Sequence, residues 1–171
     1  GERFSRQHFP EWRHGLAGRP DSFGFGAGLP AVANATGVQW FCTHKLAWNA
    51  TNPFPHRLFR WRGRGSAEVL AFMLPGIGTD ADPVAMGAEQ LKFQQSTGID
   101  RALWLPGVGD HGGGPTAEML EQLQLWQDHP QSPVREGGTV RGFLQHLEPL
   151  RTELPVWRDE LYLELHRGCA T

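Results

Sequence analysis

The stretch Arg19-Pro20-Asp21-Ser22-Phe23-Gly24-Phe25-Gly26-Ala27-Gly28-Leu29-Pro30 places one carboxylate ahead of two aromatic residues and three alternating glycines. Glycine permits sharp turns and lets the backbone approach a ligand closely. A carboxylate held on such a turn can ligate a metal or attack a substrate. The alternative is that Asp21 only caps a helix beginning near Ser22, because Asp is a preferred helix N-cap. The pattern alone leaves both interpretations open.

Outward from this stretch, segments with strand and helix character alternate along the chain. Short apolar runs predict strands at residues 38–43, 58–61, 67–74, 101–106 and 161–165. Apolar periodicity and terminal signals predict helices at residues 4–16 with a break at Pro10, 28–35, 84–95, 116–128 and 139–147. This alternation predicts an α/β fold with a largely parallel sheet. Reacting residues in such folds follow the carboxyl ends of strands, and Lys45 and Asp110 each follow a predicted strand.

Composition narrows the class of function. The 171 residues suffice for one compact domain with a core, and a formal charge of -2 does not favour nucleic acid or an acidic membrane surface. The sequence has no apolar run of membrane-spanning length and no signal-peptide pattern. Cys42 and Cys169 are too few for a disulfide framework, and neither has a paired base for nucleophilic chemistry. A reducing compartment and a cytoplasmic location are therefore expected.

Five segments of the chain together resemble one family. Residues 20–30 resemble the signature P-D-[ST]-F-G-[YF]-x-A-x-L-P of the glycoside hydrolase family 38 α-mannosidases. Residues 43–56 resemble T-[HQ]-K-L-x-W-N-x-T-N-x-F-P-H, and residues 59–63 resemble F-x-W-x-G. Residues 109–116 resemble G-D-x-G-G-G-P-T, and residues 160–168 resemble E-L-Y-L-E-x-H-x-G. The motifs keep the family's order and cover most of the chain, which is typical of its bacterial and cytosolic-type branch.

The resemblance implies part of a (β/α) barrel-like catalytic domain that performs zinc-dependent, retaining hydrolysis of terminal α-mannosides. It implies that Asp21 is both the covalent nucleophile and a zinc ligand. The family's other ligands, one further Asp and two His, have no matching residues in this sequence, and the resemblance places them outside this chain. The histidines present are scattered singly, without metal-ligand spacing.

Retaining hydrolysis also needs a second carboxyl group, about 5–5.5 Å from the nucleophile. Asp110 is the predicted acid/base, because it precedes a glycine run at the position of the family's acid. Asp80 and Asp82 are rival acids, but capping of the helix that begins at Pro83 is the preferred interpretation for both.

The predicted substrate-binding residues are Phe23, Lys45, Trp48 and His111. The resemblance makes Lys45 a fixed positive charge that keeps the nucleophile ionised, although a lysine after a strand is otherwise often a surface residue. Phe23 would form the floor of the sugar site and Trp48 a wall. His111 would modulate the neighbouring acid. Trp61 is predicted to be a core residue rather than a second wall.

The predicted substrate of the intact parent enzyme is an α-mannoside or oligosaccharide. No nucleic-acid or membrane partner is expected, and homo-oligomerisation is left open. The resemblance implies that residues 1–171 are a partial N-terminal catalytic domain, truncated at both ends and inactive alone. Two other classes stay open: a non-catalytic carbohydrate-binding module that uses Trp48 and the glycine loop, and a divergent metal-dependent deacetylase on a related barrel.

Overall fold

The computed structural model describes residues 1–109 and 113–165. They form two compact units. The first contains Gly1–Leu74 together with the described residues from Leu144 onward, and the second contains the described residues of Pro75–Phe143. Within these ranges no helix combines the length and the apolar character that crossing a membrane requires.

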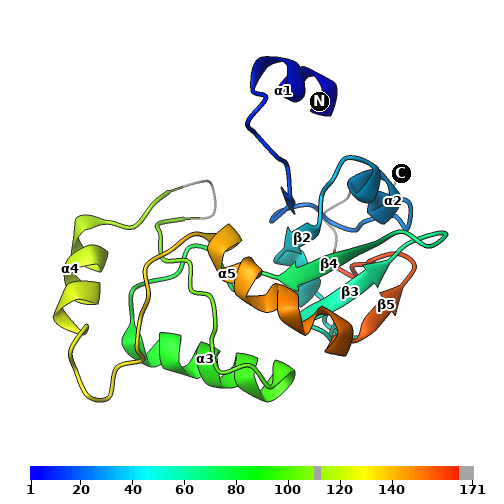
Figure 1. Cartoon of the computed structure of the whole chain (residues 1–171). Helices are drawn as coiled ribbons and strands as arrows, with labels where there is room; N and C mark the ends of the chain where they lie inside the picture. The colour runs from blue at the N-terminus through cyan, green and yellow to red at the C-terminus, as the bar shows by residue number, and fades with distance from the viewer. Residues whose placement is uncertain (110–112, 166–171) are drawn as a thin grey trace. The chain divides into compact units, whose positions relative to one another are not determined.

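A five-stranded sheet forms the first unit's centre (Figure 1). Its strands are β1 (Leu16–Gly18), β2 (Trp40–Thr43), β3 (Leu58–Arg62), β4 (Glu68–Met73) and β5 (Val156–Arg158). The spatial order is β1-β2-β4-β3-β5. β1 pairs in parallel with β2, β2 with β4, and β3 with β5, whereas β3 and β4 are antiparallel. All four residues of β2 are buried, as expected for a strand inside a sheet.

The prediction that strands and helices combine in one fold is confirmed, but the prediction of a largely parallel sheet is wrong. The connection between Arg62 and Glu68 is short, and a parallel pair would need a crossover of about a dozen residues or more. β3 is therefore antiparallel to β4, and β5 is parallel to β3. Because β1 and β5 are the two edges of an open sheet in the described chain, a (β/α) barrel is not confirmed.

Aromatic side chains from three segments build the core of the first unit. Phe25 and Phe41 pack with their ring centroids 4.7 Å apart, and Phe41 and Trp61 with theirs 5.0 Å apart. Trp61 is fully buried, which confirms its predicted core role. Its indole N–H donates to the carbonyl oxygen of Asp159 at 2.7 Å, so the ring's polar group is satisfied inside the core.

Two predicted elements of this unit are wrong. The predicted helix at 4–16 is reduced to α1 (Glu2–His8), because Pro10 removes a backbone donor and the chain then enters β1. The predicted strand at 161–165 is only a single antiparallel bridge between Leu161 and Phe25.

The remaining helical segments of the first unit are short. They are α2 (Leu29–Ala35) and the 3₁₀ helices η1 (Lys45–Ala47) and η2 (Glu148–Glu153). α2 ends before Gly37, whose φ of 82° is a left-handed conformation typical of the residue after a helix.

In the second unit, local signals set the helix boundaries. α3 (Pro83–Thr97) ends at Gly98, which adopts a left-handed conformation. α4 (Ala117–Leu125) begins after Thr116, whose hydroxyl accepts from the Met119 N–H. The predicted strand at 101–106 is wrong, since only Pro106 makes a bridge, to Thr79. The last α-helix, α5 (Val140–Leu147), has its first four residues in the second unit and its last four in the first.

Candidate active site

Two neighbouring parallel strands bring the best candidate residues together. Asp21 lies just beyond the end of β1, and Lys45 just beyond the end of β2. The Arg19 N–H donates to the Cys42 carbonyl oxygen at 2.8 Å, which continues the pairing past β1. Since parallel strands end at the same edge of a sheet, both side chains emerge at one place. The Lys45 Nζ lies 2.7 Å from Asp21 Oδ1.

The two partners of this ion pair differ in burial. The Asp21 side chain is 67% exposed, whereas that of Lys45 is 6% exposed. The Lys45 ammonium lies 3.6 Å from the centroid of the Trp48 ring and 4.9 Å from that of Phe23. The two rings meet edge to face, with centroids 5.5 Å apart. An accessible carboxylate is thus held by a cation that aromatic faces shield from water.

The local backbone explains this arrangement. Lys45 begins η1 and Trp48 caps it, with the Trp48 N–H donating to the Lys45 carbonyl oxygen at 2.9 Å. Residues three apart eclipse each other in a 3₁₀ helix, so the indole ring lies beside the ammonium. In the glycine-rich stretch, Phe25 anchors the chain in the core while Phe23 contacts Trp48. Gly24 between them has a φ of 87°, a conformation that favours glycine.

His44 is a buried neighbour of the ion pair. It is 8% exposed, and its Nδ1 has no hydrogen-bond partner among the described residues. Burial lowers the pKa of His44, the positive charge of Lys45 lowers it further, and the Asp21 carboxylate opposes this effect. The sequence did not single out His44, because a single His carries no signal of burial.

The structure brings together four of the predicted site residues: Asp21, Phe23, Lys45 and Trp48. The predicted acid/base Asp110 and its neighbour His111 lie outside the described residues.

One of the two rival acids caps the helix, and the other binds a backbone N–H that precedes it. Asp82 Oδ1 accepts from the Val84 N–H at 2.9 Å and caps α3, with Pro83 in the first turn. Asp80 Oδ1 accepts from the Ala81 N–H at 2.8 Å. The capping interpretation is therefore confirmed for Asp82.

Metal-ligating side chains do not gather in the described part of the chain, where no group of three or more His, Cys, Asp or Glu could hold an ion. Asp21 offers a single carboxylate, and Lys45 contacts one of its oxygens. These residues alone do not fit a zinc centre. Cys42 is not a further candidate, because burial raises the pKa of its thiol to about 12.

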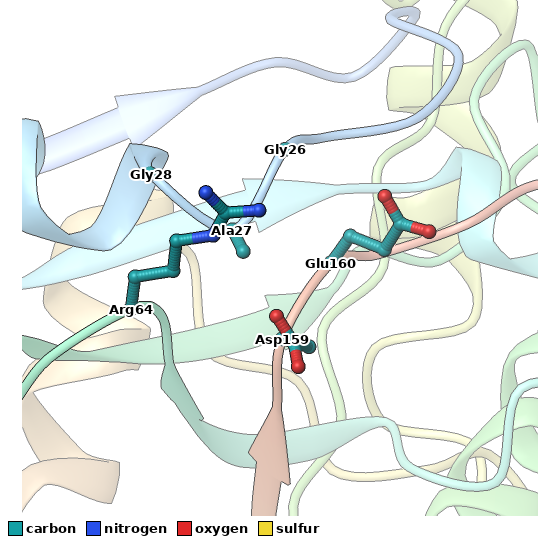
Figure 2. Close-up of a pocket in the computed structure, with 6 residues that line it drawn as sticks. All are labelled: Gly26, Ala27, Gly28, Arg64, Asp159 and Glu160. Carbon is teal, nitrogen blue, oxygen red and sulfur yellow. The ribbon is translucent and has the colours of Figure 1, made fainter.

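A separate cleft of about 610 Å³ lies on the first unit, lined by Gly26, Ala27, Gly28, Arg64, Asp159 and Glu160. Figure 2 shows the Arg64 side chain extending toward Ala27, while Asp159 and Glu160 come from the segment after β5. The lining described here includes none of the four clustered residues.

The family follows from a comparison with known domains. Residues 1–160 match the model of the glycosyl hydrolases family 38 N-terminal domain. The chain belongs to glycosyl hydrolase family 38.

Similar proteins are α-mannosidases. This family 38 chain is 40% identical over 159 residues to alpha-mannosidase G of Dictyostelium discoideum, covering 89% of the chain and 14% of that protein. It is 35% identical over 188 residues to the alpha-mannosidase of Saccharomyces cerevisiae, covering 100% and 17%. Against alpha-mannosidase 2C1 of Homo sapiens the identity is 34% over 157 residues, covering 89% and 15%. The family 38 chain therefore spans less than one fifth of the length of these relatives.

A solved structure supports the fold of this family 38 chain. The crystal structure of an alpha-mannosidase from Enterococcus faecalis matches with a TM-score of 0.65 over 85% of this chain and 18% of that chain. The sequence identity is 15%, so the match concerns the fold alone.

Proposed function

We propose that this chain is part of the catalytic domain of an α-mannosidase that hydrolyses terminal α-mannosides with retention of configuration. Family membership and the names of the relatives support the substrate class. The observation that carries the proposal is the ion pair between the exposed Asp21 carboxylate and the buried Lys45 ammonium, at the carboxyl ends of two parallel strands.

In the proposed first step, Asp21 attacks the anomeric carbon of the mannosyl ring, and the bond to the leaving oxygen breaks. Asp110 gives its proton to that oxygen, so the leaving group departs as an alcohol. In the second step, Asp110 takes a proton from water, which displaces Asp21 and restores the free carboxylate. Two inversions at one carbon give retention.

The residues around Asp21 prepare this attack. The Lys45 ammonium favours the ionised carboxylate and limits its rotation. Phe23 and Trp48 supply apolar ring surface of the kind that suits the C–H faces of a sugar. His111 is proposed to modulate the acid.

Zinc remains part of the proposal for the full-length protein. Asp21 would be one ligand, and the other ligands would lie outside the described residues. Loss of activity on chelation and its return with Zn²⁺ alone would support this, whereas full activity in a metal-free preparation would refute it.

We further propose that the enzyme is cytoplasmic and has no nucleic-acid or membrane partner, with its oligomeric state left open. Residues 1–171 alone are proposed not to turn over substrate. Turnover of an aryl α-mannoside by the isolated chain would contradict the last point.

The experiment follows hydrolysis of an aryl α-mannoside by the full-length protein, with the first-formed anomer read by proton NMR. The proposal expects α-mannose first, no measurable turnover in Asp21→Ala, and normal turnover in the exposed control Asp100→Asn. Formation of β-mannose first, or near wild-type activity in Asp21→Ala, would refute it. Mannoside binding without turnover by the wild type would favour the binding module.

A further inference from the structure

A carboxylate distant in sequence holds the chain that follows Trp48. Glu164 Oε2 accepts from the Thr51 N–H at 2.7 Å. Its Oε1 accepts from the backbone N–H of Asn52 at 2.8 Å and from the Asn52 side-chain amide at 2.6 Å. In return, the Glu164 backbone N–H donates to Asn49 Oδ1 at 2.8 Å. Glu164, more than a hundred positions away, therefore both accepts hydrogen bonds from the turn at 49–52 and donates one to it.

The same short segment also holds the loop that carries the Asp21 carboxylate. Leu161 and Phe25 exchange two backbone hydrogen bonds, both of 2.9 Å. Leu161 is fully buried in the aromatic core, so this attachment is rigid. Residues 161–164 therefore connect the loop that carries Asp21 with the segment that follows Trp48.

We propose that Glu164 is a positioning residue of the candidate active site, which fixes the turn after Trp48 and thereby keeps the Trp48 ring over the Lys45 ammonium. Its importance for catalysis rests on the function proposed above. Trp48 immediately precedes Asn49, so movement of the 49–52 turn moves the indole directly. Loss of the ring would expose the ammonium and loosen its contact with Asp21.

The number of acceptors explains why a carboxylate serves here. An ionised Glu accepts at both oxygens, whereas Gln offers one accepting oxygen and an NH₂ group that cannot accept. The N–H donors of the turn, Thr51 first, hold the pKa of Glu164 below its ordinary value of 4.5, so it is ionised at neutral pH. Glu164→Gln therefore loses the acceptor at one oxygen while keeping the size of the side chain.

The first test measures exposure of Lys45, without any substrate. The full-length protein is treated briefly with an amine-acylating reagent, and acylation of Lys45 is measured by peptide mass spectrometry. Lys92, exposed on α3, is the internal reference. Since the variant loses a hydrogen-bond acceptor that carries charge, we expect Lys45 to react about tenfold faster in Glu164→Gln. The control Glu160→Gln, a nearby carboxylate without these bonds, leaves the rate unchanged.

An unchanged Lys45 rate in Glu164→Gln would overturn the proposal. If that variant does not fold, Asn52→Ala replaces it, since it removes one donor and keeps the backbone contacts. Faster acylation of Lys45 relative to Lys92 is again expected, and an unchanged ratio again overturns the proposal.

The second test separates positioning from general stability. With kcat corrected for the folded fraction, Glu164→Gln should lower it about tenfold, matching the loss of roughly 1.4 kcal/mol of transition-state stabilisation. In a Lys45→Met background, Glu164→Gln should lower kcat by less than about a further twofold, because both substitutions disrupt the same group of contacts. Fully additive losses would overturn the proposal. If the wild-type protein shows no turnover, the proposed function is refuted. The positioning role of Glu164 is then decided by the acylation of Lys45 alone.

Discussion

Replacing Lys45 by Met tests whether the buried ammonium serves the reaction or the fold. Met has a similar length and keeps the apolar stem, but it removes the charge that lies 2.7 Å from Asp21 and 3.6 Å from the Trp48 ring centroid. The matched control is Lys92→Met, at an exposed position of α3. These are the two lysines of the sequence.

The expected change in stability is small. A cation over an aromatic ring contributes about 0.5–2 kcal/mol, and an ion pair with a largely exposed partner contributes about 0–1 kcal/mol. Against this, the substitution removes the cost of burying an ammonium, which often balances such gains. We therefore expect the free energy of local opening, measured by amide hydrogen exchange of β2, to change by less than about 1 kcal/mol.

The expected change in activity is larger. Unit charges 4 Å apart interact by about 4 kcal/mol at an effective dielectric constant of 20, and the exposure of Asp21 reduces this value. A loss of about 1.4–2.8 kcal/mol corresponds to a tenfold to hundredfold fall in kcat/KM. Removal of a neighbouring cation also makes a carboxylate easier to protonate, so the acid limb of the pH profile should move to higher pH.

The assay is hydrolysis of an aryl α-mannoside by the full-length protein between about pH 4 and pH 8, a span that covers the ordinary pKa ranges of carboxylates and histidine. Unchanged kcat/KM and an unmoved acid limb in Lys45→Met would refute the reasoning. A loss of β2 protection as large as the loss of activity would also refute it, since the ammonium would then support the fold.

Two further predictions concern the fold around the site. Gly63→Ala should destabilise β3 by about 1–3 kcal/mol in hydrogen exchange, because a Cβ there would overlap the Ala27 carbonyl oxygen. Gly26→Ala, with open space around its Cβ, is the control, and equal protection in both variants would contradict the close approach. The lowered pKa values of His44 and His56 mean that the unfolded chain binds protons more readily, so stability is complete above pH 6.5 and falls as the pH drops through it. His44→Gln should reduce that slope, and an unchanged slope would show that His44 is not its source.

Elements set by neighbouring residues could be predicted from the sequence. The capping Asp82, the terminating Gly98 and the hydroxyl of Thr116 all act within one helical turn. β1 and β5 were missed because each has three residues and is defined only by its pairing with a distant strand.

The candidate site likewise has features that the sequence could predict and features that it could not. Asp21 and Lys45 were predicted from motifs, and their adjacency follows from the parallel pairing of β1 and β2. The burial of His44 and the hydrogen bonds of Glu164 depend on chain segments far apart in sequence. A single sequence contains no local signal for either.

The most direct measurement is covalent trapping. The full-length protein is incubated with a fluorinated α-mannosyl fluoride, whose covalent adduct forms quickly and is hydrolysed slowly. The labelled peptide is then identified by mass spectrometry. The account predicts one mannosyl adduct on the carboxylate of Asp21, absent from Asp21→Ala. An adduct on any other carboxylate, or hydrolysis of ordinary substrate with no adduct at all, would contradict it.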